Sequence, residues 1–314
     1  MTKNISEIQL PTRPQVDTLI ALFILREFAK DKFKGLDEAK IIINPIIDSD
    51  TNFEKELEKG TLIIDLGDSP FNHHNTNYPT ASSAAAAFVQ KLDDPALQKL
   101  LKIAERSDKE GKGTLSEDPL DRAFGFDGFV MTLNKVHQTN PHVVIDSMMP
   151  LIEAHYAEQY KQHVGLPELW KKLLHEKKAE VYTIVFNGRR VNIAFFESED
   201  SSLPGFLRAY KGEKCELIVQ RLPSSHVNIM TKMNNGLDLK PLAILLRRSE
   251  LVLTKKPTLP IEELSKSGRI PEAPQWYYDT VTNSLLNGGL NPQSISPTNI
   301  PWQSFKPLIF SIWR

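Results

Sequence analysis

Carboxylate and imidazole side chains occur in this chain where apolar segments end and loops begin. In the stretch TLIIDLGDSPFNHHN, Asp65 ends an apolar run, and His73 and His74 lie in the loop that follows. Carboxylate oxygens and imidazole nitrogens, without thiolates, suit Mn²⁺ or Mg²⁺ better than a structural zinc. We therefore interpret this loop as a candidate metal site. The alternative is a polar surface loop that holds two histidines by chance.

Further aspartates could join this site. Asp17 stands at the start of an expected helix, Asp108 stands near the end of another, and Asp48 follows an apolar run as a rival to Asp65. Each aspartate also has an ordinary interpretation. A carboxylate in the first turn of a helix, such as Asp17, stabilises that helix. Solvated carboxylates and carboxylates at strand ends are common. In known two-metal sites the ions lie about 3.5–4 Å apart, activate water and hold a phosphoryl group.

The expected order of elements brings these side chains to one place. In the first half of the chain, short apolar runs of strand type alternate with amphipathic helices, beginning with a strand near 8–10 and a helix that starts at Asp17. This alternation predicts an α/β fold with a parallel sheet and flanking helices. Ligands bind such sheets at the carboxyl ends of the strands. We therefore expect the aspartates and the histidine pair at that edge.

The second half has a different pattern. From residue 179, strand-like runs predominate, and Asn187-Gly188 between two of them is the strongest hairpin signal in the chain. We predict a first domain over 1–160, a helical linker over 161–178 and a smaller, mixed α+β domain over 179–314. The tryptophan-containing tail is too apolar to be disordered and is expected to pack on the core.

The composition excludes several classes of protein. Lys and Arg number 38 against 39 Asp and Glu, for a net charge of -1, so no global basic excess holds a long nucleic acid. The single cysteine, Cys215, excludes an intramolecular disulfide and cysteine-rich zinc sites. The chain shows no apolar signal segment and no run long enough to span a bilayer, which predicts a cytoplasmic protein without membrane association. A homo-oligomer is compatible with the sequence.

Taken together, the chain resembles the DHH phosphoesterase superfamily, which includes RecJ-type exonucleases, oligoribonucleases and family II pyrophosphatases, and within it the Myg-type exonuclease branch. The third motif of that family, Asp-His-His, corresponds to NHHN, in which Asn72 replaces the aspartate and His73 and His74 are kept. Asp65 corresponds to the strand-end aspartate of the second motif, and Asp108 corresponds to the aspartate of the fourth.

The first motif of the family, His-x-Asp-x-Asp, corresponds to TRPQVD. Only Asp17 fits it, and Thr12 and Gln15 stand in place of the expected histidine and middle aspartate. Together with Asn72, these replacements remove donors and negative charge that two divalent cations require. The site of one metal is therefore expected to be weak or absent.

The resemblance implies a DHH-like first domain with a smaller substrate-binding domain after it. It also implies a metal-dependent phosphoesterase that acts on a small phosphorylated compound or a short oligonucleotide. Asp65, His73 and His74 would be the catalytic group, with His74 on the phosphate. One or two ions of Mn²⁺ or Mg²⁺ would be held by the following residues: Asp17, Asp65, His73 and Asp108.

The second domain would contribute side chains that hold the substrate. The candidates are His226 in PSSHVN, Arg189 and Arg248, since guanidinium groups bind phosphate bidentately. The alternatives are a histidine satisfied within a sheet and solvated arginine pairs at Arg189-Arg190 and Arg247-Arg248. Two alternatives for the whole protein also stay open. One is the same fold acting as a binding or scaffolding protein without catalysis, and the other is an unrelated α/β protein.

Overall fold

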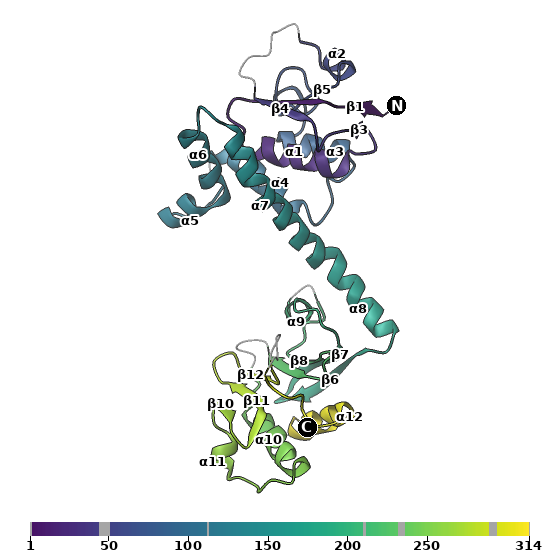
Figure 1. Cartoon of the computed structure of the whole chain (residues 1–314), viewed down its shortest axis with the longest axis vertical. Coiled ribbons are helices and arrows are strands. Elements are labelled where there is room, and N and C mark those ends of the chain that lie inside the picture. The colour runs from purple at the N-terminus through teal and green to yellow at the C-terminus, as the bar shows by residue number, and fades with distance from the viewer. Residues whose placement is uncertain are drawn as a thin grey trace. The chain divides into compact units, whose positions relative to one another are not determined.

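The computed structural model describes residues 2–43, 51–111, 113–209, 212–231, 236–288 and 294–313 (Figure 1). The chain divides into two compact units, Met1–His163 and Val164–Arg314. The division falls inside the segment 161–178 that was predicted as a linker. The predicted α/β class is confirmed, because the first unit has parallel strands with helices and the second has a mixed sheet.

The first unit is built on short parallel strands. The central strand β2 pairs in parallel with β4 on one side and β5 on the other, and β1 pairs in parallel with β3. Parallel strands are usually buried on both faces; here β5 is fully buried, whereas β2 alternates buried with partly buried residues. The strands are β1 (Lys3–Asn4), β2 (Glu7–Leu10), β3 (Phe33–Lys34), β4 (Lys40–Ile43) and β5 (Thr61–Ile63).

Helix α1 is the centre of the first core. Every residue from Val16 to Leu25 is buried, and the helix contacts α3, α4 and α7 (Figure 1). The small side chains of the alanine-rich α3 allow α3 and α1 to approach each other closely. The helices are α1 (Val16–Phe28), α2 (Phe53–Glu58), η1 (His73–Asn75), α3 (Ala81–Phe88), α4 (Gln98–Glu110), α5 (Pro119–Phe124), α6 (Phe126–Val136) and α7 (His142–Tyr160).

The second unit contains a seven-stranded sheet of order β10-β11-β12-β9-β8-β7-β6. The β7–β8 pair is parallel and the other pairs are antiparallel. The strands are β6 (Ala179–Phe186), β7 (Arg189–Glu197), β8 (Leu217–Arg221), β9 (Val227–Thr231), β10 (Gly268–Ile270), β11 (Ala273–Asp279) and β12 (Ser284–Leu286). The π-helical turn η2 (Lys161–Gly165) spans the chain position where the two units divide. The helices of the second unit are α8 (Leu166–His175), α9 (Leu203–Arg208), α10 (Lys240–Leu253), α11 (Ile261–Leu264) and α12 (Trp302–Ile312).

Two local predictions for the second unit are confirmed. Asn187 and Gly188 have φ angles of 50° and 74°, the left-handed region that a two-residue hairpin turn requires. The flanking residues Phe186 and Arg189 are partners in the β6–β7 ladder. The apolar tail packs on the core, because α12 buries Phe305 and Ile309.

A buried arginine ties α10 to the rest of the second unit. The Arg247 side chain is fully buried, and its guanidinium donates hydrogen bonds to the backbone carbonyls of Leu264, Lys266, Gly268 and Trp276. Burial without a carboxylate partner lowers the pKa of Arg247 to about 10. The interpretation of Arg247 as a solvated side chain is therefore wrong, because these carbonyls accept hydrogen bonds from both terminal nitrogens of the guanidinium inside the protein.

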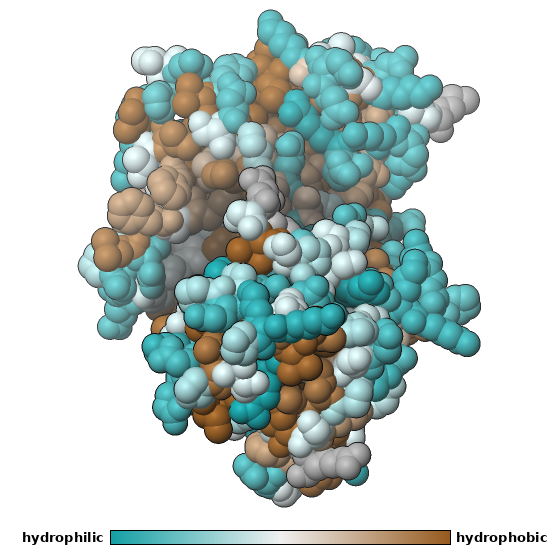
Figure 2. Space-filling view, turned by 60° about the horizontal axis from the view of Figure 1, so that its bottom comes forward, coloured by the Kyte–Doolittle hydropathy of each residue, from teal (hydrophilic) through white to brown (hydrophobic). Residues whose placement is uncertain are grey.

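The face drawn in Figure 2 is mostly hydrophilic, and its apolar side chains gather in several groups. Some apolar surface is normal for a folded protein. Within the described ranges, we find no helix with both the length and the apolar character needed to cross a membrane.

Candidate metal centre

Asp17 lies in the first turn of α1, directly after the loop that leaves β2. Its side chain is only 5% exposed. The backbone N–H of Ala81, at the start of α3, donates a 3.3 Å hydrogen bond to Asp17 Oδ2. Burial is the main cause that raises the pKa of this carboxyl, and that hydrogen bond and the nearby His73 oppose the shift. The fold therefore holds Asp17 in an environment where its negative charge is costly without a cation.

Asp65 stands two residues after β5 in a left-handed backbone conformation, with a φ of 59°. Aspartate adopts this region at lower cost than most residues. The hydroxyl of Thr18 donates a 2.6 Å hydrogen bond to Asp65 Oδ2. Burial and the adjacent charge of Asp17 raise the pKa of Asp65 to about 7. The turn after β5 thus directs a second carboxylate, nearly as buried as the first, towards α1.

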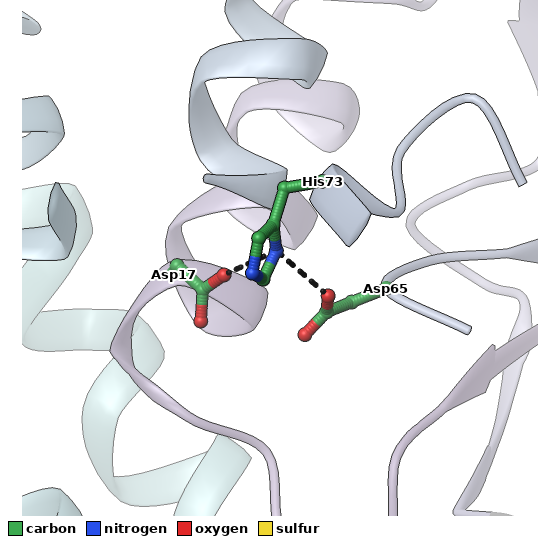
Figure 3. Close-up of side chains that lie close together, drawn as sticks. All are labelled: Asp17, Asp65 and His73. Atoms are coloured by element: carbon green, nitrogen blue, oxygen red, sulfur yellow. Dashed lines mark ion pairs between the residues drawn. The ribbon is translucent and has the colours of Figure 1, made fainter. Parts of the chain in front are cut away.

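His73 brings an imidazole between these two carboxylates (Figure 3). Its Nδ1 atom lies 3.5 Å from Asp17 Oδ2 and 3.4 Å from Asp65 Oδ1. That Nδ1 atom is buried and accepts or donates no hydrogen bond among the described residues. A buried nitrogen without a hydrogen-bond partner is costly, which makes Nδ1 a candidate ligand for a cation.

The spacing of these atoms suits a single cation. Ligand atoms of Asp17, Asp65 and His73 all lie within 4.8 Å of one another. Ligands about 2.1 Å from one ion stand roughly 3.0–3.4 Å apart in octahedral or tetrahedral geometry. The separations from Nδ1 to the two carboxylates are therefore near those of an assembled site. Two carboxylates and one imidazole fit the predicted Mn²⁺ or Mg²⁺.

Asp108, on the last turns of α4, lies on the other side of the imidazole. Its Oδ1 atom is 3.6 Å from His73 Nε2, and its side chain is 30% exposed. Histidines that bind a metal usually direct their second nitrogen to a carboxylate or carbonyl, which fixes the ring. In the described part of the chain, the converging ligand atoms belong to Asp17, Asp65 and His73. The position of Asp108 favours a role in orienting His73 over the predicted role of direct ligand.

The neighbours of His73 in the loop have other roles. His74 is exposed, and its ring centroid lies 4.1 Å from that of His73. Asn72 shapes the loop, since its Oδ1 accepts a hydrogen bond from the backbone N–H of His74 and its Nδ2 donates to the carbonyl of Gly67. Asn72 therefore serves as a cap of η1, and His74 stays the predicted phosphate contact.

The residues aligned with the first family motif require one correction. Thr12 and Gln15 are exposed. When Asp17 is aligned with the last aspartate of His-x-Asp-x-Asp, Gln15 stands at the middle aspartate and Arg13 at the histidine. Arg13, and not Thr12, is therefore the residue at the histidine position. A guanidinium is a cation and cannot bind a metal as histidine does. The rival aspartate Asp48 lies outside the described residues.

The residues predicted to bind substrate in the second unit are one buried histidine and two exposed arginines. His226 is buried, and its Nδ1 and Nε2 atoms lie 2.9 Å from Ser224 Oγ and 2.7 Å from the carbonyl oxygen of Ile295. These contacts support the interpretation of a histidine satisfied within its fold. Arg189 and Arg248 are exposed, and their substrate roles stay predictions.

Two groups that position the site were not predicted from the sequence. The Thr18 hydroxyl holds Asp65, and the Ala81 backbone N–H holds Asp17. Thr18 directly follows an aspartate in the first helical turn, and this adjacency is the only local signal for its role. The contact of Ala81 depends on the packing of α3 against α1, which no short stretch of sequence reveals.

Comparison with models of known protein families found no family model that matches the chain. A comparison with curated proteins found no match either. The resemblance to the DHH superfamily thus rests on the quoted motifs.

Proposed function

We propose that this protein is a divalent-metal-dependent phosphoesterase that acts on a small phosphorylated compound or a short oligonucleotide. The observation that carries the proposal is the convergence of Asp17, Asp65 and the unpartnered Nδ1 of His73. Residues far apart along the chain meet there at a spacing suited to one cation. The net charge of -1 gives no support to a long nucleic acid as substrate.

The charge and position of each side chain define its role in the proposed reaction. Asp17 and Asp65 supply the negative charge that balances a divalent ion, and His73 supplies a neutral nitrogen. Asp108 faces the other nitrogen of His73 across 3.6 Å and would help to orient the ring. A divalent cation, when bound, would stabilise negative charge on the phosphoryl oxygens and lower the pKa of water. His74, exposed beside His73, would donate a hydrogen bond to a substrate phosphate.

Hydrolysis of bis(p-nitrophenyl) phosphate, a chromogenic phosphodiester, tests this function. We expect release of nitrophenol by the wild-type protein in Mn²⁺ and not in EDTA. The Asp65→Asn variant should lose at least about 100-fold in kcat/KM, because it lacks one charged ligand. His74→Gln should lose less and should bind Mn²⁺ normally. The exposed His175 on α8 offers a matched control in His175→Gln. Hydrolysis that is unaffected by EDTA or by Asp65→Asn would refute the proposal.

The second candidate is a binding or scaffolding protein that holds a metal or phosphate without hydrolysis. Two observations favour this candidate. Arg13 and Gln15 stand where the family has two metal ligands. Asn72 stands where the family has an aspartate, and its side chain makes hydrogen bonds within the loop. Stoichiometric Mn²⁺ binding without turnover of any phosphoester would support this candidate over the first.

A further inference from the structure

A cavity of about 290 Å³ lies in the first unit between residues of α1, α4 and α6. Val16 and Ser107 line it, and they directly precede Asp17 and Asp108 in the chain. The cavity therefore shares α1 and α4 with the metal centre. Its volume is close to the lower limit of about 300 Å³ for pockets that bind small molecules.

Hydrogen bonds between three elements hold the walls of this cavity in place. The side-chain amide of Asn134, on α6, donates a 2.9 Å hydrogen bond to the carbonyl of Pro14 in the loop before α1. The Ser107 hydroxyl, on α4, donates to the carboxylate of the buried Asp127 on α6. The cavity is therefore a formed part of the first unit.

The lining of the cavity combines an apolar surface with positive charge. Val130 and Met131 of α6 provide apolar surface, Arg13 and Lys135 provide two cations, and Asp127, which accepts from Ser107, provides one carboxylate. Within the ranges that the structure describes, neither cationic side chain has an ion-pair or hydrogen-bond partner. Two cations without an ion-pair partner, which outnumber the one carboxylate of the lining, are suited to a ligand that brings its own negative charge.

We propose that this cavity binds the part of a compact phosphoester that is not hydrolysed, and that Arg13 and Lys135 bind a second anionic group on it. This inference rests on the proposed function and narrows its substrate class to small phosphoesters with an additional carboxylate or phosphate. The small volume excludes a long polymer from the cavity itself, so such a ligand is a metabolite-sized compound or the end of a short oligonucleotide.

A matched pair of ligands tests the proposal. 3-Phosphoglycerate and glycerol 3-phosphate are similar in size, and only the first carries a carboxylate besides its phosphate. Calorimetry is run with the whole chain, once in metal-free buffer and once with Mn²⁺. We expect about tenfold tighter binding of 3-phosphoglycerate, the effect of one hydrogen-bonded charge. The preference should weaken as salt is raised, because both cations are exposed.

Charge-matched variants identify the source of the preference. The double variant Arg13→Gln, Lys135→Gln should lose it, whereas Lys55→Gln, Lys102→Gln, which removes two exposed cations elsewhere in the first unit, should keep it. Equal affinity for the two ligands in the wild-type protein, no binding of either, or a preference that survives in the first variant would overturn the proposal.

The same measurements distinguish failure of the cavity assignment from failure of the proposed phosphoesterase function. If the protein binds no Mn²⁺ but keeps the preference in metal-free buffer, the cavity assignment stands and the metal-dependent reaction falls. If the protein binds Mn²⁺ and hydrolyses the chromogenic diester without any preference, the reaction stands and the cavity assignment falls.

Discussion

The Thr18 hydroxyl donates a 2.6 Å hydrogen bond to Oδ2 of Asp65, while Oδ1 of the same carboxylate faces His73 Nδ1 at 3.4 Å. One oxygen of Asp65 is thus held by a hydrogen bond, and the other is among the atoms that could hold a cation. Thr18 is fully buried in the first turn of α1, so this contact joins α1 to the end of β5.

Replacing Thr18 by valine removes the hydroxyl while nearly keeping the shape of the side chain. We expect Thr18→Val to bind Mn²⁺ about 10–100-fold more weakly, because a ligand carboxylate that loses its hydrogen bond is poorly oriented. Thr18→Ser keeps the donor and should stay near wild type. Equal Mn²⁺ affinity of Thr18→Val and the wild-type protein, measured by calorimetry, would show that the contact does not position the site.

Asp108 is expected to act through His73. Since its Oδ1 lies 3.6 Å from Nε2, on the ring side away from Asp17 and Asp65, Asp108→Asn should weaken Mn²⁺ binding about tenfold without abolishing it. Asp65→Asn should abolish measurable binding. If the two variants lose equal affinity in the same calorimetric titration, Asp108 is a direct ligand after all.

The metal-free protein should become less stable as the pH rises through the titration of Asp65. Its pKa is about 7 in the fold against an ordinary value of 3.8, so the folded state binds this proton more tightly than the unfolded state does. Below about pH 4 both states are protonated, and above about pH 7 the full cost of the buried charge is present. Between these values the free energy of unfolding should fall by up to about 1.4 kcal/mol per pH unit from this group.

Chemical denaturation in EDTA at pH 5 and pH 7.5 measures this effect. Asp65→Asn lacks the titration, and asparagine tolerates the left-handed backbone at this position. The stability of the variant relative to wild type should therefore improve as the pH rises. Mn²⁺ affinity of the wild-type protein should increase over the same range, because the proton competes with the ion. A pH-independent difference between the two proteins would contradict the assignment of this pKa.

Arg247 should be important for the stability of the second unit and unimportant for the metal centre. Arg247→Met leaves several buried carbonyls without their donor, and we expect a loss of about 3 kcal/mol or more in the free energy of unfolding. The adjacent, exposed Arg248 gives a matched control, and Arg248→Met should stay within about 0.5 kcal/mol of wild type. Similar unfolding curves for the two variants would refute the role of Arg247.

The parts of the fold predictable from the sequence are those set by local patterns. The periodic apolar positions of α1 and the Asn187-Gly188 turn express short-range rules of helix and hairpin formation. Asp65 and His73 were recognisable as candidates because each follows a strand or lies in the loop after it. These features depend on residues that are neighbours in the chain.

What the sequence left undetermined depends on contacts between distant segments. The packing of α3 against α1 decides that Ala81 holds Asp17. The direction of the His73 ring decides that Asp108 meets its second nitrogen. The burial of Arg247 results from carbonyls 17 to 29 residues away along the chain, and no helical periodicity reveals them.

The central claim is that Asp17, Asp65 and His73 together hold one divalent cation. Calorimetric titration of the metal-free protein with Mn²⁺ at pH 7.5 tests it most directly, with His73→Gln as the site variant and His175→Gln as the control. We predict stoichiometric binding by the wild-type protein and by the control, and none by His73→Gln. No Mn²⁺ binding by the wild-type protein at millimolar concentration, or binding that His73→Gln leaves unchanged, would contradict the claim.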